Sequence, residues 1–159
     1  MYFEFMKAIV PLVFLALLVT PARSQTTVTL CELLRNPNEY NGKVVTVRAT
    51  LRFGFEWSQL YCLDCLESGR AWLVLPSDLE EDQVSRKALK KLSREAGIAN
   101  LTVQGVFSSG GTYGHENGYQ FQIRAVRISD MAVIQKGMRP LVEEHKVEQR
   151  WACGGSNPR

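Results

Sequence analysis

The close cysteine pair in Cys62-Leu-Asp-Cys65 is the first place in this sequence where residue type and spacing could support chemistry. Two thiols at this spacing can form a redox couple, supply half of a tetrahedral zinc site, or serve as structural disulfide partners. A redox couple needs a helix N-terminus to lower the thiol pKa, whereas this pair follows a predicted strand and enters a turn. Zinc needs two further ligands, which Cys31 and Cys153 could supply. The sequence favours disulfides, with thiol redox chemistry or zinc binding at Cys62 and Cys65 as the alternative function.

An apolar run near the N-terminus predicts export. Residues 8–20 follow Lys7 and precede Ala22 and Ser24, two small residues spaced as in a signal-peptide cleavage site. The run is shorter than the ~20 residues that a helix needs to span a bilayer. We therefore expect residues 1–24 to be a cleaved secretory signal peptide, with no stable membrane span after cleavage.

Cleavage would release a periplasmic or extracellular domain that begins at Gln25, whether translation starts at Met1 or at Met6. All four cysteines would remain, and an even number in a small exported domain is typical of a disulfide framework. The formal net charge of the whole chain is +3, whereas nucleic-acid binding would require a clustered basic face. We expect no nucleic-acid partner.

No catalytic constellation can be recognised. The sequence lacks a G-x-S-x-G elbow that would expose a serine nucleophile. Gly42-Lys43 lacks the spacing and the following Ser or Thr of a phosphate-binding loop. We expect a protein without catalysis, metal ion or other cofactor, whose partner is an envelope glycan, peptide or protein.

Aromatic residues beside a Gly-rich segment are the candidate ligand contacts. The segment SSGGTYGHENG, residues 108–118, reads as a mobile hairpin loop. Aromatic faces next to a flexible polar loop suit a glycan or a peptide. The tentative ligand-binding residues are Trp57, Tyr61, Tyr113, His115, Glu116 and Asn117. The competing interpretation is that Trp57 packs in the core and that the loop is only solvated, and Trp72, inside an apolar run, is expected to be buried.

The elements that position these residues follow from hydrophobic periodicity. Alternating apolar and polar residues predict strands at 43–53, 100–107 and 119–128. Two further strands are predicted at 56–63 and at 70–75, and the latter is almost entirely apolar, so we expect it to be covered on both faces. Capping boxes predict a short helix that begins at Thr29 and stops at Asn36, and a long helix over 77–97. The first strand should bend at Gly54 and the last should carry a bulge near Ala125.

Three strands, one long helix and two more strands form the element order of an OB-fold, a five-stranded Greek-key barrel. We therefore predict a mainly β domain with helices, a five-stranded OB-fold-like barrel over 25–138. An open sheet crossed by one helix is the runner-up. Residues 139–159 are expected to form a C-terminal helix from Pro140 and a disordered tail. OB barrels bind ligands on the second and third strands and in flanking loops, where the aromatic candidates lie.

One stretch resembles small exported bacterial proteins of uncharacterised function. The segment LCELLRNPNEYNGKVVTVRATLRFGFEWSQLYC, residues 30–62, carries Cys-Glu, then Asn-x-x-x-Tyr-x-Gly-Lys-x-Val-x-Val-Arg, then Gly-Phe-Glu. The resemblance is close over about a quarter of the mature chain and loose elsewhere. It implies an OB-like barrel and an exported location, and it assigns no catalytic or ligand residue.

The two close cysteines are not expected to pair with each other. A Cys62–Cys65 bridge closes a tiny loop, whereas a bridge from Cys31 to the same hairpin closes a much longer one, worth roughly 3–4 kcal/mol in the chain-entropy model. The resemblance implies that Cys31 pairs with Cys65, at the position that follows the Gly-Phe-Glu motif. Cys62 and Cys153 would then form the second disulfide.

Overall fold

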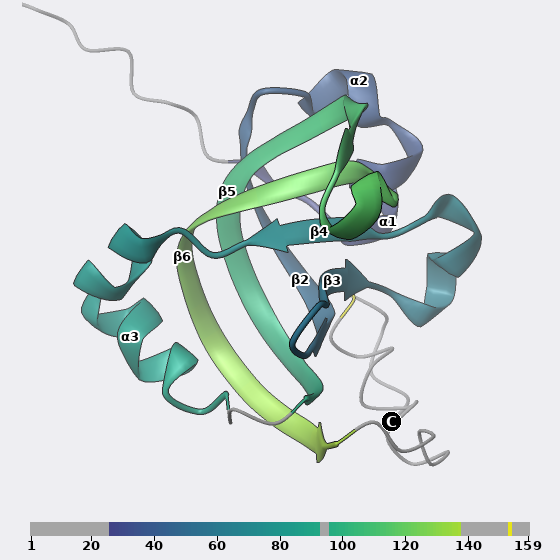
Figure 1. Ribbon diagram of the computed structural model, residues 1–159. Coiled ribbons are helices and arrows are strands. Elements are labelled where there is room, and N and C mark those ends of the chain that lie inside the picture. The colour runs from purple at the N-terminus through teal and green to yellow at the C-terminus, as the bar shows by residue number, and fades with distance from the viewer. Residues whose placement is uncertain (1–25, 93–95, 138–152, 154–159) are drawn as a thin grey trace, which may run out of the picture.

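The computed structural model describes residues 26–92, 96–137 and 153 (Figure 1). The predicted signal peptide, the predicted helix from Pro140 and the predicted tail, apart from Cys153, lie outside the described residues. In the part of the chain that is described, no helix is long and apolar enough to cross a membrane.

The described chain is mainly β with short helices, as the sequence predicts. Its strands are β1 (Thr26–Thr27), β2 (Val44–Phe53), β3 (Ser58–Tyr61), β4 (Ala71–Val74), β5 (Gly97–Tyr113) and β6 (Tyr119–Lys136). Its helices are α1 (Leu30–Arg35), α2 (Pro37–Tyr40) and α3 (Gln83–Leu89), with 3-10 turns η1 (Leu63–Ser68), η2 (Ser77–Glu81) and η3 (His115–Asn117). Six strands replace the five predicted, because the short β1 pairs in parallel with β2.

The strand pairings run around a closed path. Hydrogen-bonded neighbours follow the order β1-β2-β3-β4-β6-β5, and β2 also pairs with β5. β2 pairs antiparallel with β5 over its whole length, and β4 pairs in parallel with β6. The result is not a regular barrel, because β3 and β4 share only two residue pairs while β5 and β6 are 17 and 18 residues long. Figure 1 shows β5 and β6 as long curved neighbours, with α3 beside β6.

One core cluster joins the sheet to α1 and also takes in Leu79 of η2 and Ala88 of α3. The predicted alternation of the first long strand is confirmed for the apolar face of β2, where Val45, Val47 and Leu51 are at most 1% exposed, but Thr50, expected on the wet face, is fully buried. α1 adds Leu30 and Leu33, both fully buried. Each such side chain contributes roughly 1.5–3 kcal/mol on transfer from water, so the face of β2 that covers α1 is a principal source of stability.

The predicted start and end of the first helix are confirmed. Thr29 Oγ1 accepts a hydrogen bond from the Glu32 backbone N–H at 3.1 Å, and the helix ends at Asn36. A second short helix, α2, follows where turns were predicted. Pro37 is its first residue, a position at which the missing proline N–H costs nothing.

The predicted continuous helix over 77–97 is wrong. The segment divides at Asp82 into η2 and α3, and Gly97, predicted to end the helix, begins β5. Asp82 Oδ2 accepts hydrogen bonds from the Ser85 backbone N–H and hydroxyl at 2.8 and 2.7 Å. These bonds start a new helix at Asp82 and lower the pKa of its carboxyl. Ser85 Oγ in turn accepts from the Ile128 backbone N–H at 2.9 Å, which ties α3 to β6.

Both strands that flank the Gly-rich segment are longer than predicted. Its first residues continue β5 instead of forming a loop, and they pair with the start of β6. Polar and glycine residues can extend a two-stranded ribbon because backbone pairing does not require burial of their side chains. The predicted bulge is confirmed one residue beyond Ala125: Gly105 faces Ala125 and Gln104 faces Arg127, so Val126 is unpaired.

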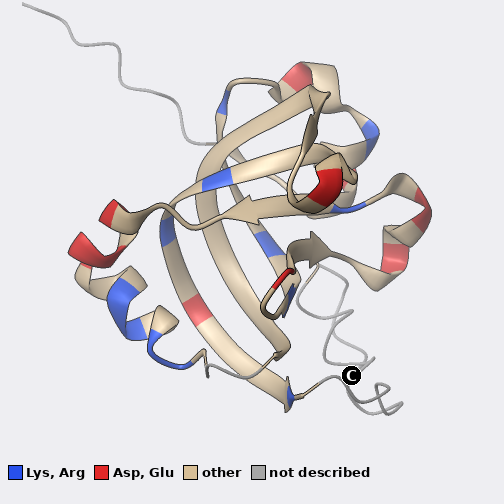
Figure 2. Ribbon diagram, in the orientation of Figure 1, with Lys and Arg blue, Asp and Glu red and all other residues tan. Residues whose placement is uncertain are grey.

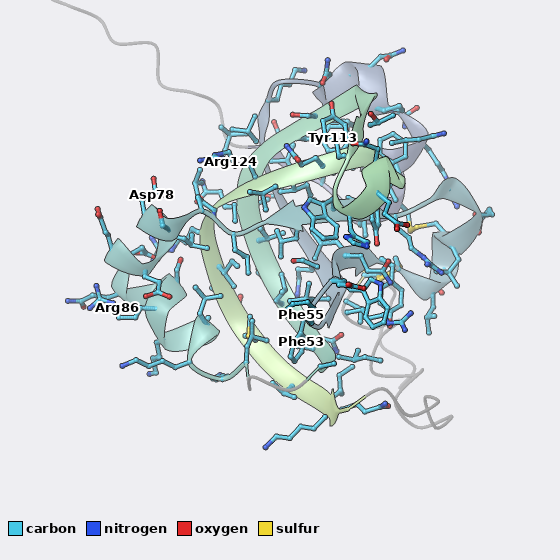
Figure 3. All side chains as sticks on the ribbon, viewed as in Figure 1. Phe53, Phe55, Asp78, Arg86, Tyr113 and Arg124 are labelled. Atoms are coloured by element: carbon cyan, nitrogen blue, oxygen red, sulfur yellow. A yellow bond between two sulfur atoms is a disulfide. The ribbon has the colours of Figure 1, made fainter. Side chains whose placement is uncertain are left out.

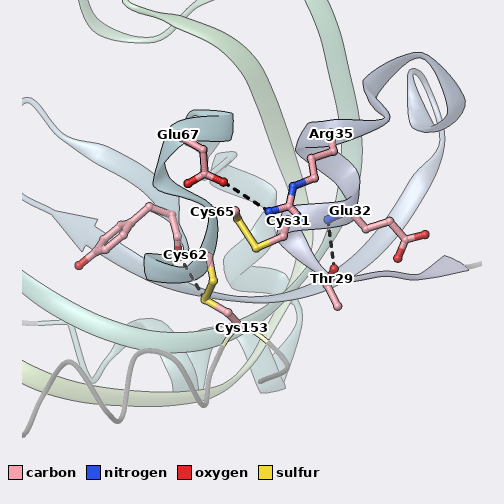
Figure 4. Close-up of a disulfide and its surroundings, with 9 residues drawn as sticks. Thr29, Cys31, Glu32, Arg35, Cys62, Cys65, Glu67 and Cys153 are labelled. Atoms are coloured by element: carbon pink, nitrogen blue, oxygen red, sulfur yellow. Dashed lines mark hydrogen bonds and ion pairs between the residues drawn. A yellow bond between two sulfur atoms is a disulfide. The ribbon is translucent and has the colours of Figure 1, made fainter. Parts of the chain in front are cut away.

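Two disulfides connect η1 to distant parts of the chain, as predicted (Figure 4). Cys31 of α1 is bonded to Cys65, with Cα atoms 5.6 Å apart, and Cys62 is bonded to Cys153, with Cα atoms 5.7 Å apart. Both separations fit ordinary disulfide geometry. Cys62 and Cys65 are therefore not bonded to each other.

We expect Ser85→Ala to lower the free energy of unfolding by about 1–3 kcal/mol, because the buried N–H of Ile128 would lose its acceptor. Chemical denaturation of both proteins measures the change. Ser77→Ala, an exposed serine at the start of η2, is the matched control and should change stability by less than about 0.5 kcal/mol. Equal effects of the two substitutions would contradict the role given to Ser85.

The hydrogen bond from Tyr40 Oη to Glu32 Oε1, 2.8 Å long, together with burial and the Glu32 charge, raises the pKa of Tyr40 to about 12. The folded-state pKa lies above the ordinary value of 10.0, so protonated Tyr40 stabilises the fold below pH 10. That contribution is lost as the pH rises from 10 toward 12. Glu32→Gln should therefore lower the pKa of Tyr40 toward 10.

Ultraviolet absorbance of tyrosinate after a rapid pH jump measures this pKa, with Tyr40→Phe to identify the step that belongs to Tyr40. An unchanged step in Glu32→Gln would show that the carboxylate does not control the tyrosine.

Candidate ligand-binding groove

The loop between β2 and β3 and the loop between β5 and β6 meet on one face of the molecule. Gly54, where the first strand was predicted to bend, instead ends β2: its N–H donates to the Trp57 carbonyl at 2.8 Å and closes a turn. His115 Nε2 lies 3.9 Å from Glu56 Oε2 and 3.8 Å from Glu116 Oε1. The imidazole therefore lies between carboxylates of both loops.

Two adjoining hollows flank this meeting point. The larger, about 610 Å³, is called the Trp57 groove. It is lined by Trp57, Gln59, Leu66, Glu67, Ser68, Gly69, Arg70, His115, Glu116, Gly118, Tyr119, Gln120 and Phe121. The smaller hollow has a volume of about 430 Å³. It is lined by the two aromatic residues of the β2–β3 loop, Phe55 and Trp57, and by Trp72 and His115. Trp57 and His115 line both, so they form the ridge between them.

Trp57 is held in place from one side. Its side chain is 39% exposed, unusually high for a tryptophan. The Arg52 guanidinium lies 5.0 Å from the centre of the indole ring, within the range of a cation–π contact. Because Arg52 covers one face of the indole, a planar ligand would stack on the opposite face. Phe55, fully exposed, lies on the same loop (Figure 3).

The floor of the Trp57 groove is a hydrogen-bonded pair from two strands. Tyr119 Oη donates to Gln59 Oε1 at 2.8 Å, and the Gln59 residue is 4% exposed. Burial raises the pKa of the Tyr119 hydroxyl. The Tyr119 ring also packs against Trp72, with ring centres 5.2 Å apart and planes tilted by 52°. The aromatic floor is therefore fixed at both its polar and its apolar ends.

Gly114 lets the β5–β6 loop approach this floor. Its backbone has φ +73° and ψ −163°, a region that residues with a Cβ avoid. A Cβ at this position would lie 2.5 Å from Trp72 Cδ2 and 2.8 Å from Tyr119 Cδ2. The loop that carries His115 therefore rests directly on the Trp72–Tyr119 pair, and this close approach leaves room only for glycine at position 114.

The predicted ligand residues are only partly brought together. Trp57, His115 and Glu116 line the Trp57 groove. Tyr61 is 7% exposed and lines neither hollow.

The other two predicted residues lie on or near the β5–β6 loop but outside both hollows. Tyr113, labelled in Figure 3, donates to the Ser109 carbonyl of its own strand at 3.4 Å. Asn117 is exposed with φ +56°. The ligand-binding role of all six residues stays a prediction.

Several residues that line the two hollows could not be identified from the sequence. Trp72 was expected to be buried but is half-buried and lines the smaller hollow. Gln59, Tyr119 and Phe121 belong to β3 and β6, and the parallel pairing of β4 with β6 brings them together. The alternation Tyr119-x-Phe121 signalled a shared face, but the sequence gives no indication of which strand that face adjoins.

The charge of the Trp57 groove is mixed. Glu67 and Glu116 line it together with Arg70 and His115. Figure 2 shows both acidic and basic positions along the ribbon of the described chain.

A group of residues that could hold a metal ion lies outside the groove. Among the described residues it consists of Cys31, Cys62 and Cys65, whose sulfur atoms lie within 4.8 Å of one another. These sulfurs are in disulfides and cannot act as thiolate ligands in that state.

We expect Gly114→Ala to lower the free energy of unfolding by about 1–3 kcal/mol more than Gly110→Ala, because its new Cβ would displace the Trp72–Tyr119 pair. Gly110 is the matched control: it also has a positive φ, +78°, but a Cβ there meets nothing within 4 Å. Denaturation gives the stabilities, and near-ultraviolet circular dichroism reports the tryptophan environment. Equal losses in the two variants would show that the close approach has no energetic consequence.

Comparisons with known proteins do not assign this chain to a family. No protein-family model matches it, and no curated protein does. One similar solved structure is that of a proposed aspartyl-tRNA synthetase from Leishmania major Friedlin, with 13% sequence identity and a TM-score of 0.40. The match covers 90% of this chain and 29% of that one, so this chain spans less than a third of its length.

Proposed function

We propose that this protein is an exported, non-catalytic binding module built on an OB-fold-like barrel, and that it binds a glycan in the Trp57 groove. The closed path of pairings supports the barrel, because β2 pairs with β5 and β4 runs parallel to β6. If the two-residue β1 is left aside, these are the first, fourth, third and fifth strands of the barrel. The helix α3, between β4 and β5, belongs to the same architecture. The irregular sheet would then be a distorted member of this fold.

The exposed position of Trp57 is the observation that carries the binding proposal. Trp57 directly precedes β3, beside the loop that contains His115. In an OB barrel, β3 and β4 would be the second and third strands, which together with the flanking loops form the usual ligand surface. A solvent-exposed indole with one face already occupied by Arg52 is suited to stacking a planar or ring-shaped ligand.

The lining of the groove favours a glycan over a peptide. Peptide side chains are commonly anchored in apolar pockets, and Leu66 is the one aliphatic side chain among the described lining residues. Aromatic rings can stack on a sugar ring, and exposed amides and carboxylates beside them, such as Gln120 and Glu67, can bond its hydroxyls. The mixed charge argues against a nucleic-acid ligand, whose phosphates would require a basic groove.

Two disulfides and the apolar run at 8–20 support an oxidising, exported location. A glycan of the cell envelope is the ligand class that such a location offers. A second candidate function, thiol chemistry at Cys62 and Cys65, is favoured by the three clustered sulfurs.

We expect Trp57→Ala to lower the affinity for oligosaccharides about tenfold, the loss that corresponds to one stacking contact of about 1.4 kcal/mol. An array of bacterial envelope oligosaccharides, with a peptide library in parallel, identifies ligands, and titration calorimetry measures the affinity. Val126→Ala is the control, since this side chain is exposed but lines neither hollow.

Equal affinity in Trp57→Ala would place the site elsewhere. A protein that binds peptides but no oligosaccharide would replace the glycan in this proposal with a peptide.

A further inference from the structure

The two disulfides lie close together where the chain enters η1. The Cys31, Cys62 and Cys65 sulfurs lie within 4.8 Å of one another, although Cys62 belongs to a different disulfide from the other two. A thiolate formed at Cys65 would therefore be close to the sulfur of Cys62. Thiol–disulfide exchange needs such an approach of a thiolate to a disulfide sulfur.

The two disulfides differ in exposure. Cys31 is partly exposed on α1, whereas Cys62 and Cys65 are fully buried and Cys153 is 5% exposed. The partly exposed Cys31 residue makes the Cys31–Cys65 bond the one that an external thiol can approach more easily. The Cys62–Cys153 bond is more buried, and Cys153 meets the surface only in a hollow of about 350 Å³ that it lines with Thr29 and Glu32. An internal thiolate therefore offers the shorter route to the buried bond.

We propose that the two disulfides form an exchange relay, in which reduction begins at Cys31 and passes through Cys65 and Cys62 to Cys153. An external thiolate attacks Cys31 Sγ, and the Cys31–Cys65 bond breaks with its electron pair on Cys65. The Cys65 thiolate attacks Cys62 Sγ, and the Cys62–Cys153 bond breaks with its electron pair on Cys153, which takes a proton from water. A second external thiol frees Cys31 as a thiol and leaves as a small-molecule disulfide.

The electrons balance in this sequence. Two external thiols become one disulfide, and the protein gains two electrons as its two disulfides become one Cys62–Cys65 disulfide and two thiols. The backbone allows the new bond: the Cys65 N–H donates to the Cys62 carbonyl at 3.4 Å. A turn of this kind holds the two Cα atoms within about 7 Å, and disulfides join Cα atoms about 4.4–6.8 Å apart.

The relay would connect the surface of α1 to the C-terminal segment at Cys153. After exchange, η1 would be bonded neither to Cys31 nor to Cys153, although residues 66–70 line the Trp57 groove. The chemistry needs only the cysteines and does not depend on the proposed glycan. Failure of glycan binding and failure of the relay are therefore separate results.

Graded reduction of the folded protein with glutathione, followed by rapid alkylation and peptide mapping, tests the relay. In the wild type we expect an intermediate with a Cys62–Cys65 bond and with Cys31 and Cys153 alkylated. In Cys31→Ser/Cys65→Ser, which removes the accessible disulfide, alkylation of Cys153 should be at least tenfold slower than in the wild type. Loss of a disulfide destabilises a protein, so local unfolding would change this rate in the opposite direction.

Cys31→Ser alone gives the matched comparison, because it leaves a free thiol at Cys65. Exchange should release Cys153 in this variant without any added thiol. The relay is refuted if Cys153 is released as fast in the double variant as in the wild type, or if the Cys62–Cys65 bond never forms in either the wild type or Cys31→Ser.

Discussion

The parallel pairing of β4 with β6 is the contact on which the groove depends. Only four residues of β4 take part, from Ala71 opposite Phe121 to Val74 opposite Arg124. Parallel neighbours need a long crossover, and here η2, α3 and β5 provide it. This pairing closes the path of strands and places the start of β6 beside β3. Without it, Tyr119 would not reach Gln59 and the β5–β6 loop would not lie against Glu56.

Features encoded by neighbouring residues could be predicted from the sequence. The alternation in β2, the cap at Thr29, the end of α1 at Asn36 and the bulge next to Ala125 depend on side-chain periodicity, local hydrogen bonds or proline geometry. The division of the predicted long helix has a local cause and a distant one. Asp82 and Ser85 form the cap of α3, and the Ile128 N–H of the neighbouring strand β6 donates to Ser85 Oγ. Helical periodicity alone does not contain that contact.

The candidate site could be predicted in part for the same reason. Trp57 and His115 were recognised because an aromatic residue on the predicted second strand and a polar residue in the Gly-rich loop lie where OB barrels usually bind ligands. Trp72 was misjudged because an apolar run suggests burial on both faces, whereas alternate residues of β4 are buried and half-buried. Gln59 is an ordinary strand residue until Tyr119 donates a hydrogen bond to it. The floor of the groove is thus a product of strand pairing, and no single segment specifies it.

The disulfides compensate for the weakness of η1. Short 3-10 turns have poor hydrogen-bond geometry, and Cys65 departs from helical geometry inside this one, with φ −148° and ψ 37°. Such a segment has little stability of its own, yet its end forms one wall of the Trp57 groove. Anchoring η1 to α1 and to Cys153 restricts the wall before a ligand arrives, which reduces the ordering that binding requires. The same crowding of two covalent anchors into one turn brings their sulfurs together, so the rigidity of the wall and the capacity for exchange have a single structural origin.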